Sequence, residues 1–241
     1  MTFGSNTSRR STETEERTLQ FASPLQYQLV RDNLDAYKRD AFELLLRRYA
    51  GDDLKSPGWR HNTEVDGVKT LYGEVENNSW QTTLTTADIP QKAHVVASIL
   101  LDKEKMSQYD DTVDTINSLE QLDENTELKI VCCKSVFMTT PRDICVVTTY
   151  TCEESGRYLI VTRSVNHPNG TQKGYTRAYI YLSGYIITPD PADSNKCHIA
   201  MIAHINLSGL VPPFISKYAG QTVPIRMVRA IRDVATKAVD T

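Results

Sequence analysis

The side chains best suited to acid–base or metal chemistry are scattered along this sequence. His198 and His204 fall six residues apart on a segment with strand character, so they share a face but lie about 20 Å apart and cannot bind one metal ion. Asp110, Asp111 and Asp114 form an acidic cluster, which we interpret as the solvated start of a strand, because paired acid–base catalysis needs further partners. We therefore expect no catalytic residue and no metal site.

Nucleophile and cofactor motifs give the same result. The sequence contains no G-x-S-x-G, G-x-x-x-x-G-K-[ST], G-x-G-x-x-G or H-E-x-x-H motif. Its five cysteines form no C-x-x-C pair and fall in strand-like segments, at Cys132, Cys133, Cys145, Cys152 and Cys197. We interpret them as free, buried thiols in a reducing compartment, and we expect no cofactor.

Length and charge limit the class of protein. A chain of 241 residues fits one large domain. A net charge of -3 argues against a general nucleic-acid binder. The sequence has neither a run of about 18 apolar residues nor an apolar stretch near its N-terminus of the kind that signals secretion. We expect a cytoplasmic monomer with no nucleic-acid partner.

Hydrophobic periodicity predicts a disordered tail over residues 1–22 and one domain over residues 23–241. A helix is predicted from Ser23, as its cap, to Gly51, as its terminator. Two short helical stretches are predicted after Asp88, which would cap the first of them, and a long helix at the C-terminus. The predicted elements are a helix over 23–50, strands over 59–65, 68–76 and 79–87, helical stretches over 90–101 and 103–108, strands over 113–122, 125–136, 143–152, 157–167, 174–188 and 196–207, and a helix over 212–238.

This order of elements predicts an α+β fold. Strands that follow one another without intervening helices favour an antiparallel sheet, and a sheet of nine strands tends to curl. The two long helices must bury their apolar faces against that sheet. A curled sheet closed by an amphipathic helix can enclose a hollow between the two.

The C-terminal helix has two faces with different roles. Val223, Met227 and Ile231 lie on one face and would cover the sheet, whereas Arg226 and Arg229 lie on the flank and far side. The basic residues either form a solvated face or settle on anionic lipid headgroups. Both interpretations are open from the sequence.

A second candidate for membrane contact is the loop at 136–141, which carries Phe137 and Met138 between two predicted strands. Large apolar side chains in a loop are not expected to be fully solvated. They either fold back into the core or insert into a membrane surface.

Six segments, in order, resemble the START domains, the lipid-transfer family related to the steroidogenic acute regulatory protein. The family has a W-D-x-x-V…I-D-x-x-T segment, a P-R-D strand opener, and characteristic closing strands before its last helix. The matching segments are 109–113 (YDDTV, with Tyr109 where Trp is usual), 119–126 (LEQLDENT), 141–143 (PRD), 174–178 (GYTRA), 183–189 (SGYIITP) and 206–212 (NLSGLVP). The resemblance runs from about residue 23 to the end.

This resemblance implies a helix-grip fold, in which a curved nine-stranded antiparallel sheet holds the C-terminal helix over an internal lipid tunnel. It also implies that the loop before residues 141–143 gates the tunnel together with that helix and touches membranes. Several relatives bury an acidic/basic pair in the tunnel; by alignment the pair falls here near Val131 and Thr148, and neither residue is charged. The family's ligand class therefore does not carry over.

We expect the protein to bind one lipid (sterol, phospholipid or sphingolipid) and to transfer it between membranes. Lumen-facing hydroxyls would fix the polar end, with Thr148, Tyr150, Tyr179 and Tyr181 as candidates. Arg177 would pair with the headgroup or, alternatively, with a backbone carbonyl. His204, as a core or pocket histidine, and Val131 complete the set of ligand-binding candidates, together with Val223, Met227 and Ile231 on the last helix.

Two other functions fit the same fold. One is an enzyme, a cyclase or a hydrolase, which would need titratable groups that converge in the tunnel; His198, His204 and Arg177 are its candidates. The other is a lipid sensor or scaffold that does not transfer its ligand and uses the N-terminal tail to bind partners.

Overall fold

One twisted sheet forms the centre of the computed structural model, which describes residues 24–135, 139–170 and 172–238. The predicted tail over residues 1–22, the predicted cap Ser23, and Phe137 and Met138 lie outside these ranges. Nine strands follow one another in the order β2-β3-β4-β11-β10-β8-β7-β6-β5, and every neighbouring pair on this path is antiparallel. The fold class predicted from the sequence is therefore confirmed.

The strand bounds agree with the predicted segments to within three residues at each end. The predicted strand over 174–188 is divided into two, and β1 and β9 lie outside the main path, where they pair in parallel with β8 and β7. The strands are β1 (Leu25–Gln26), β2 (Arg60–Val65), β3 (Val68–Glu74), β4 (Gln81–Ile89), β5 (Val113–Asp123), β6 (Thr126–Cys133), β7 (Arg142–Cys152), β8 (Tyr158–Asn166), β9 (Thr176–Arg177), β10 (Tyr179–Pro189) and β11 (Cys197–Asn206).

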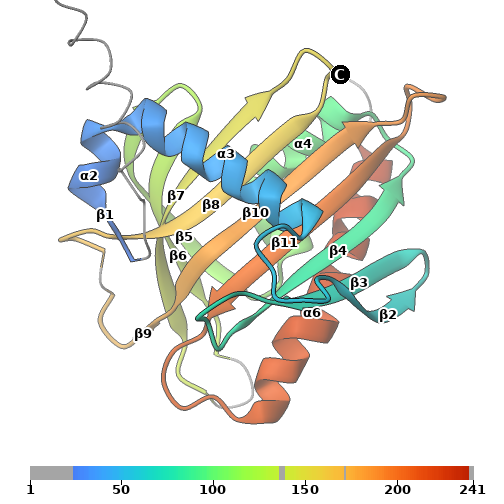
Figure 1. Cartoon of the computed structure of the whole chain (residues 1–241). Coiled ribbons are helices and arrows are strands. Elements are labelled where there is room, and N and C mark those ends of the chain that lie inside the picture. The colour runs from blue at the N-terminus through green and yellow to red at the C-terminus, as the bar shows by residue number, and fades with distance from the viewer. Residues whose placement is uncertain (1–23, 136–138, 171, 239–241) are drawn as a thin grey trace, which may run out of the picture.

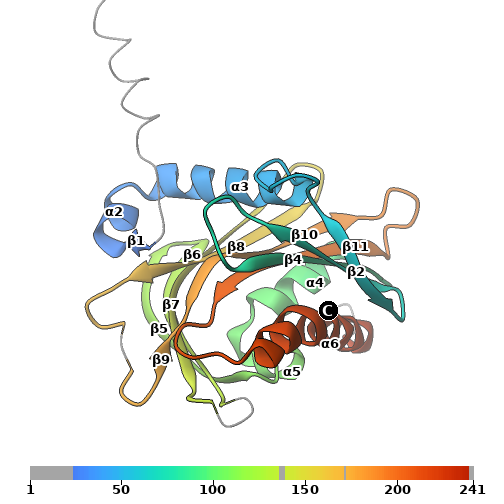
Figure 2. The same cartoon turned by 60° about the horizontal axis from the view of Figure 1, so that its bottom comes forward.

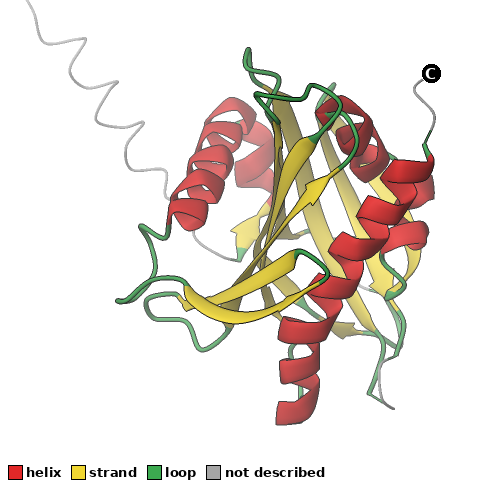
Figure 3. Cartoon of the chain, turned by 90° about the vertical axis from the view of Figure 1, so that its right-hand side faces the viewer, coloured by secondary structure: helices red, strands yellow, loops and turns green. Residues whose placement is uncertain are grey.

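Helices cover both faces of the sheet (Figures 1 and 3). Helices α2 and α3 lie on the convex face, whereas α4, α5 and α6 lie on the concave face, which curls around them (Figure 2). No helix of the described ranges combines the length and the apolar character needed to cross a membrane. The helices are α2 (Tyr27–Asp32), α3 (Leu34–Ala50), α4 (Ala93–Leu101), the 3₁₀ turn η1 (Lys103–Lys105), α5 (Met106–Tyr109) and α6 (Pro213–Lys237).

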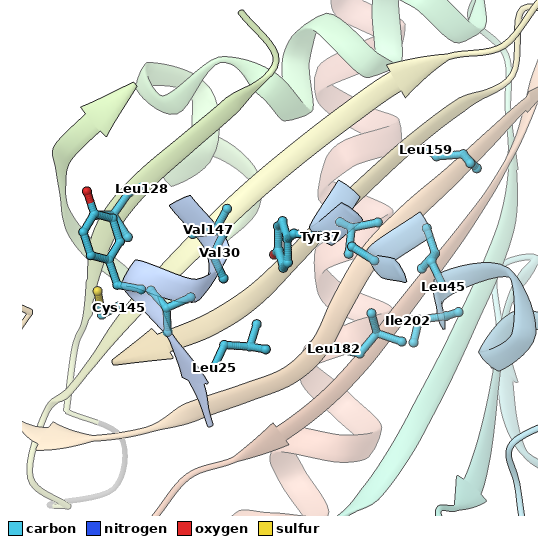
Figure 4. Packing of buried hydrophobic residues seen from close by; sticks show 14 of the residues in the cluster. Leu25, Val30, Tyr37, Leu45, Leu128, Cys145, Val147, Leu159, Leu182 and Ile202 are labelled. Atoms are coloured by element: carbon cyan, nitrogen blue, oxygen red, sulfur yellow. The ribbon is translucent and has the colours of Figure 1, made fainter. Parts of the chain in front are cut away.

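The core on the convex face comes from the apolar side of α3 (Figure 4). Tyr37, Ala41 and Leu45 recur every four residues, so they face the same side of the helix, and all three are fully buried against the sheet. Gly184 allows this close contact, because a Cβ atom there would lie 2.9 Å from Leu45 Cδ1 and 2.4 Å from the Ile160 carbonyl oxygen. This layer contributes stability to the fold without touching the concave face.

The first predicted helix is interrupted. Residues that we expected to open it form β1, and Asn33 divides the remainder into α2 and α3, since its backbone (φ -132°, ψ 43°) is not helical. The side chain of Asn33 donates to the Leu29 carbonyl, which stabilises the break. Gly51 ends α3 with φ 86°, as the sequence predicted.

Two further predictions were wrong. Asp88 does not cap α4, which begins at Ala93; instead it belongs to β4, and its Oδ1 lies 2.8 Å from His198 Nδ1 on β11. Of the five cysteines expected to be buried, Cys152, at the end of β7, is exposed, and Cys133, at the end of β6, is only partly buried. Both errors come from strand ends, where the sequence pattern does not say whether a side chain faces a neighbouring strand or solvent.

Candidate functional site

A cavity of about 290 Å³ lies between the concave face of the sheet and helix α6. Its lining is mostly apolar. Strands β6, β7, β8, β10 and β11 form its floor, the first half of α6 forms its roof, and α4, α5 and the turn after α5 form one wall. The cavity therefore exists only when the C-terminal helix packs over the completed sheet.

Side-chain alternation decides which floor residues face the cavity. On β7, Val146 and Thr148 line it, whereas Cys145 and Val147 are fully buried in the core on the opposite face. On β6, Val131 lines the cavity by the same rule. The structure thus places the candidates Val131 and Thr148 at the cavity, and their contribution to binding stays a prediction.

A β-bulge between Ile180 and Leu182 reverses the alternation within β10. Ile180 lines the cavity before the bulge and Ser183 lines it afterwards, although they differ by an odd number of residues. Tyr181, at the bulge, does not line the cavity; its ring lies 4.7 Å from that of His204 between centroids. The prediction that Tyr181 faces the cavity was based on an unbroken strand, and the bulge overturns it.

Three hydroxyl side chains cross the floor on adjacent strands, and we call Thr148, Thr162 and Ser183 the hydroxyl row. Thr148 pairs with Thr162 across β7 and β8, and Thr162 pairs with Ser183 across β8 and β10. The Oγ1 atoms of the two threonines are 3.0 Å apart, so one hydroxyl donates to the other. Each hydroxyl has one donor and two acceptor sites, and the row thus offers polar groups within an apolar lining.

Lys129 is a cationic side chain of the cavity lining that the sequence analysis missed. It lies two residues before Val131 on β6 and is 8% exposed. Its Nζ lies 3.4 Å from Glu127 Oε2, and burial lowers its pKa from the ordinary value for lysine. Strand alternation could have identified it, because Val131 was already assigned to the cavity and residues two apart share a face.

The roof is formed by the first half of α6. Val223 and Met227, both predicted at the cavity, line it there, and Met227 Sδ lies 3.6 Å from the hydroxyl of Tyr185 on the floor. Ile231, one turn further along, does not line the cavity. It is fully buried in a solid core with residues such as Ile89, so the cavity ends before this turn.

Asp110 lies on the wall of the cavity, although we expected it to be solvated. Its Oδ1 accepts hydrogen bonds from the backbone N–H and the hydroxyl of Thr112. Burial raises the pKa of Asp110 above its ordinary value. Burial also raises the pKa of Cys133, another lining residue, to about 12. That thiol therefore stays protonated at neutral pH and is not an activated nucleophile.

Residues 40–236 match the family model of the START domain. This chain belongs to the START domain family. The matched range includes the nine strands of the main path, the hydroxyl row, Lys129 and nearly all of α6. The resemblance found in the sequence is thereby confirmed.

Solved structures show the same fold as this START domain. It is similar to the human StarD13 (DLC2) lipid transfer and protein localization domain, with a TM-score of 0.67 and 23% identity over 82% of this chain and 98% of that chain. It is also similar to human StAR-related lipid transfer protein 5, with a TM-score of 0.75 and 16% identity over 85% of this chain and 97% of that chain.

A curated relative from Mus musculus is described as an acetyl-coenzyme A thioesterase. It is 22% identical over an alignment of 200 residues, and the match covers 74% of this chain and 35% of the relative. The START domain thus spans about a third of the length of that protein.

Arg177 of the START domain is directed at the protein rather than at the cavity. It pairs with Asp143, which is 1% exposed, through Nε at 3.1 Å and NH2 at 2.7 Å, and it also donates to the Gly170 carbonyl. Arg177 is not among the lining residues. The pair with Asp143 ties β9 to the start of β7, and the contact with the Gly170 carbonyl agrees with the second of the two alternatives for Arg177, a backbone carbonyl rather than a headgroup.

His204 faces the convex side. Its Nδ1 lies 3.2 Å from Arg48 NH1 of α3, and its Nε2 lies 3.0 Å from the Trp80 carbonyl. Arginine can only donate, so Nδ1 accepts and the proton lies on Nε2. Burial, together with the charge of Arg48, lowers the pKa of His204 to about 4. His204 is therefore a neutral core histidine and not a cavity residue, and it does not belong to a set of titratable groups that converge in the cavity.

Tyr150 and Tyr179 are also outside the lining. Tyr150 lies on the same face of β7 as Thr148 but beyond the end of the cavity, where it packs against the core of α4 and α6. Tyr179 is adjacent to Ile180, which lines the cavity, and therefore lies on the opposite face of the sheet. The sequence assigned strand faces correctly here for Tyr150 but could not say where the cavity ends.

The arginines predicted to contact membranes pair with acidic residues of neighbouring loops. Arg226 NH2 lies 2.7 Å from Asp111 Oδ1, and Arg229 NH2 lies 2.7 Å from Asp66 Oδ2. All four side chains are about half exposed. The two ion pairs connect the middle of α6 to the turn after α5 and to the β2–β3 turn, and they leave the arginines accessible to solvent.

Two large apolar side chains are exposed where β11 leads into α6. Leu210 is 98% exposed and Phe214 is 61% exposed. They follow Leu207, which lines the cavity, and they precede the first lining residue of α6. The sequence analysis did not single them out, although Leu210 follows Gly209, whose positive φ of 68° marks a turn.

Proposed function

We propose that this START domain binds one lipid in the cavity beneath α6 and carries it between membranes. The observation that carries the proposal is the mostly apolar cavity, which lies between a sheet and an amphipathic helix. Burial of apolar ligand surface contributes about 25 cal/mol per Å², so an occupant with a hydrocarbon body is favoured. The hydroxyl row supports the binding of a polar group at one end of that body.

We propose further that the protein acts as a cytoplasmic monomer that touches membranes only transiently. Leu210 and Phe214 support such contact, because exposed apolar side chains beside a binding cavity are typical of membrane-docking surfaces. Arg226 and Arg229 support it as well, since half-exposed guanidinium groups can exchange a carboxylate for a lipid phosphate. Passage of the lipid would require α6 to separate from its neighbouring loops.

An enzyme is the second candidate, favoured by the similarity to a mouse thioesterase. The described lining argues against it, because the Cys133 thiol is held in its protonated form and His204 faces the other side of the sheet. We therefore propose binding and release without bond cleavage. Incubation of the full chain with acetyl-coenzyme A and fatty acyl-coenzyme A tests this, since release of free thiol would overturn it.

The proposed function is tested by extraction of the purified full chain and identification of its lipid by mass spectrometry, followed by transfer of that lipid between vesicles. We expect a stoichiometric lipid and transfer that increases with protein concentration. Stoichiometric lipid without any transfer would favour a sensor, the third possibility. The absence of bound lipid after purification and reconstitution would refute lipid binding.

A further inference from the structure

We propose that the cavity selects a compact lipid with one anionic head, a carboxylate or a phosphate, and that Lys129 binds this head. The inference rests on the proposed lipid binding and assigns a ligand class to it. It starts from the position of a cation inside a lining that is otherwise mostly apolar. The position differs from those of Val131 and Thr148, to which the family's acidic/basic pair aligns.

The Lys129 ammonium group has unused binding capacity. It carries three donors, and among the described residues it makes one hydrogen bond, to Glu127 Oε2 at 3.4 Å. Glu127 is already shared, because its Oε1 accepts a hydrogen bond from Ser118, to which Lys103 also donates. Glu127 forms an ion pair with Lys129, but two of the three ammonium donors have no partner among the described residues. These two donors are available to an anionic oxygen of a ligand.

Burial makes the unused donors of this ammonium group costly when no ligand is bound. Lys129 is 8% exposed, and an ammonium group loses hydration in such a site. An anionic oxygen would restore the lost interactions and form charge-assisted hydrogen bonds. A neutral ligand would leave the cost in place. The site thus discriminates between an acid and its uncharged ester.

The hydroxyl row continues the polar lining from Lys129 across the floor of the cavity. Lys129 pairs with Val146 across β6 and β7, and Thr148 lies two residues further along the same face. The step between residues two apart on a strand is about 7 Å, which lies within the reach of a lysine side chain and a headgroup together. Whichever of the Thr148 and Thr162 hydroxyls accepts the hydrogen bond between them keeps its own proton free, and it would then donate to the second oxygen of a carboxylate or to a further oxygen of a phosphate.

The other charges of the lining orient the ligand. Asp110 is next to Cys133, at the C-terminal end of β6 and about 13 Å from Lys129 along the strand. Two cations of the lining lie at that same end: Arg142, whose guanidinium donates to the Leu207 and Thr140 carbonyls, and the exposed Lys134, whose Nζ donates to the Asp111 carbonyl. Asp110 offsets part of their charge, whereas no carboxylate of the described lining accompanies Lys129, so an anionic head is favoured at Lys129 and the hydrocarbon tail extends towards Cys133.

The size of the cavity restricts the hydrocarbon body. Ligand pockets in proteins span about 300–1,000 Å³, and this cavity, at about 290 Å³, is at the lower end. A single acyl chain or a compact ring system is favoured over a phospholipid with two chains. Fatty acids, acidic sterol derivatives and single-chain phosphates share the required chemistry.

The test compares cis-parinaric acid with its methyl ester, two fluorescent probes with the same chain, on the delipidated full-length protein. We expect the acid to bind about 10- to 100-fold more tightly, as for a hydrogen-bonded charge. In Lys129→Met this preference should vanish through a loss of acid binding, while the ester binds as before. Lys129→Arg should keep the preference, and Lys69→Met, which removes an exposed lysine of β3, should leave both affinities unchanged.

Competition with dodecyl phosphate and lauric acid distinguishes the two kinds of head. Equal affinity of the unaltered protein for acid and ester would overturn the inference but leave lipid binding intact. A parallel loss of both probes in Lys129→Met would also overturn it, because the lysine would then be merely structural. If neither probe binds and no lipid co-purifies, the proposed function itself fails.

Discussion

Replacement of Met227 by tryptophan tests whether α6 covers a cavity or a solid core. Met227 lines the cavity, and its sulfur contacts the Tyr185 hydroxyl at 3.6 Å. An indole side chain at this position would occupy part of the 290 Å³ space. Because empty volume is available, we expect a loss of less than about 1 kcal/mol in the free energy of unfolding, which corresponds to a midpoint shift below about 4 °C for a chain of this size.

Ile231→Trp is the matched control on the same helix. Ile231 lies one turn further along, is 0% exposed and packs in a solid core. Overpacking such a site costs about 1–3 kcal/mol, and an indole should reach the upper end of that range. At about 2–4 °C per kcal/mol, the midpoint should fall by about 6–12 °C, whereas lipid stoichiometry in the folded fraction should be unchanged.

The assay pairs two measurements on delipidated protein, the thermal midpoint and the stoichiometry of a fluorescent lipid analogue. We expect Met227→Trp to bind less of the analogue with nearly unchanged thermal midpoint. We expect Ile231→Trp to have a lower thermal midpoint with unchanged binding stoichiometry. If Met227→Trp destabilises as much as Ile231→Trp and binds the analogue at wild-type stoichiometry, the lipid does not lie beneath this helix, and the reasoning is refuted.

Three further perturbations test other parts of the structure. The pKa of His204 is lowered to about 4 in the folded state, against about 6.5 in the unfolded state. The neutral histidine therefore contributes about 3 kcal/mol of stability above pH 6.5, and this contribution is lost as the pH falls towards 4. In urea unfolding, the stability difference between wild type and His204→Gln should shrink over this pH window, and a constant difference would contradict the assignment. Leu210→Ser with Phe214→Ser should slow transfer between vesicles about tenfold or more and spare equilibrium lipid binding; an unchanged transfer rate would exclude this surface from docking. Gly184→Ala should lower the free energy of unfolding by more than about 1 kcal/mol, because its Cβ would lie 2.4 Å from a backbone oxygen, whereas Gly220→Ala, with 3.9 Å to the nearest atom, should not.

Strand period and element order made most of the fold predictable from the sequence. The family resemblance placed Val131 and Thr148 in the tunnel, and helical spacing assigned Val223 and Met227 to one face of α6; all four line the cavity. Strand alternation and helical spacing are local geometry that the backbone of a regular element imposes, so residues at these spacings share a face. Alternation by two residues from Val131 would have found Lys129.

The remaining site predictions failed where local geometry does not decide the outcome. The bulge beside Tyr181 depends on pairing with β11, which a single strand does not encode. The cavity ends before Tyr150 and Ile231 because cores from other segments fill that space. Arg177 turned away from the lumen because Asp143, a buried carboxylate on another strand, binds it. Each case depends on tertiary contacts between segments far apart in the sequence.

The two halves of helix α6 differ in how much of their surface is packed against the rest of the protein. Its second half carries the fully buried Val228, Ile231 and Ala235, whereas its first half spans the cavity, and Pro224 between them has no N–H to donate to the Gly220 carbonyl. Few buried contacts beneath a segment allow it to open locally at a free energy below that of global unfolding. Amide hydrogen exchange should therefore divide the helix, with fast exchange before Pro224 and slow exchange after it. Entry and exit of the proposed lipid would then be independent of global stability, so the loading rate could change without any change in the melting temperature.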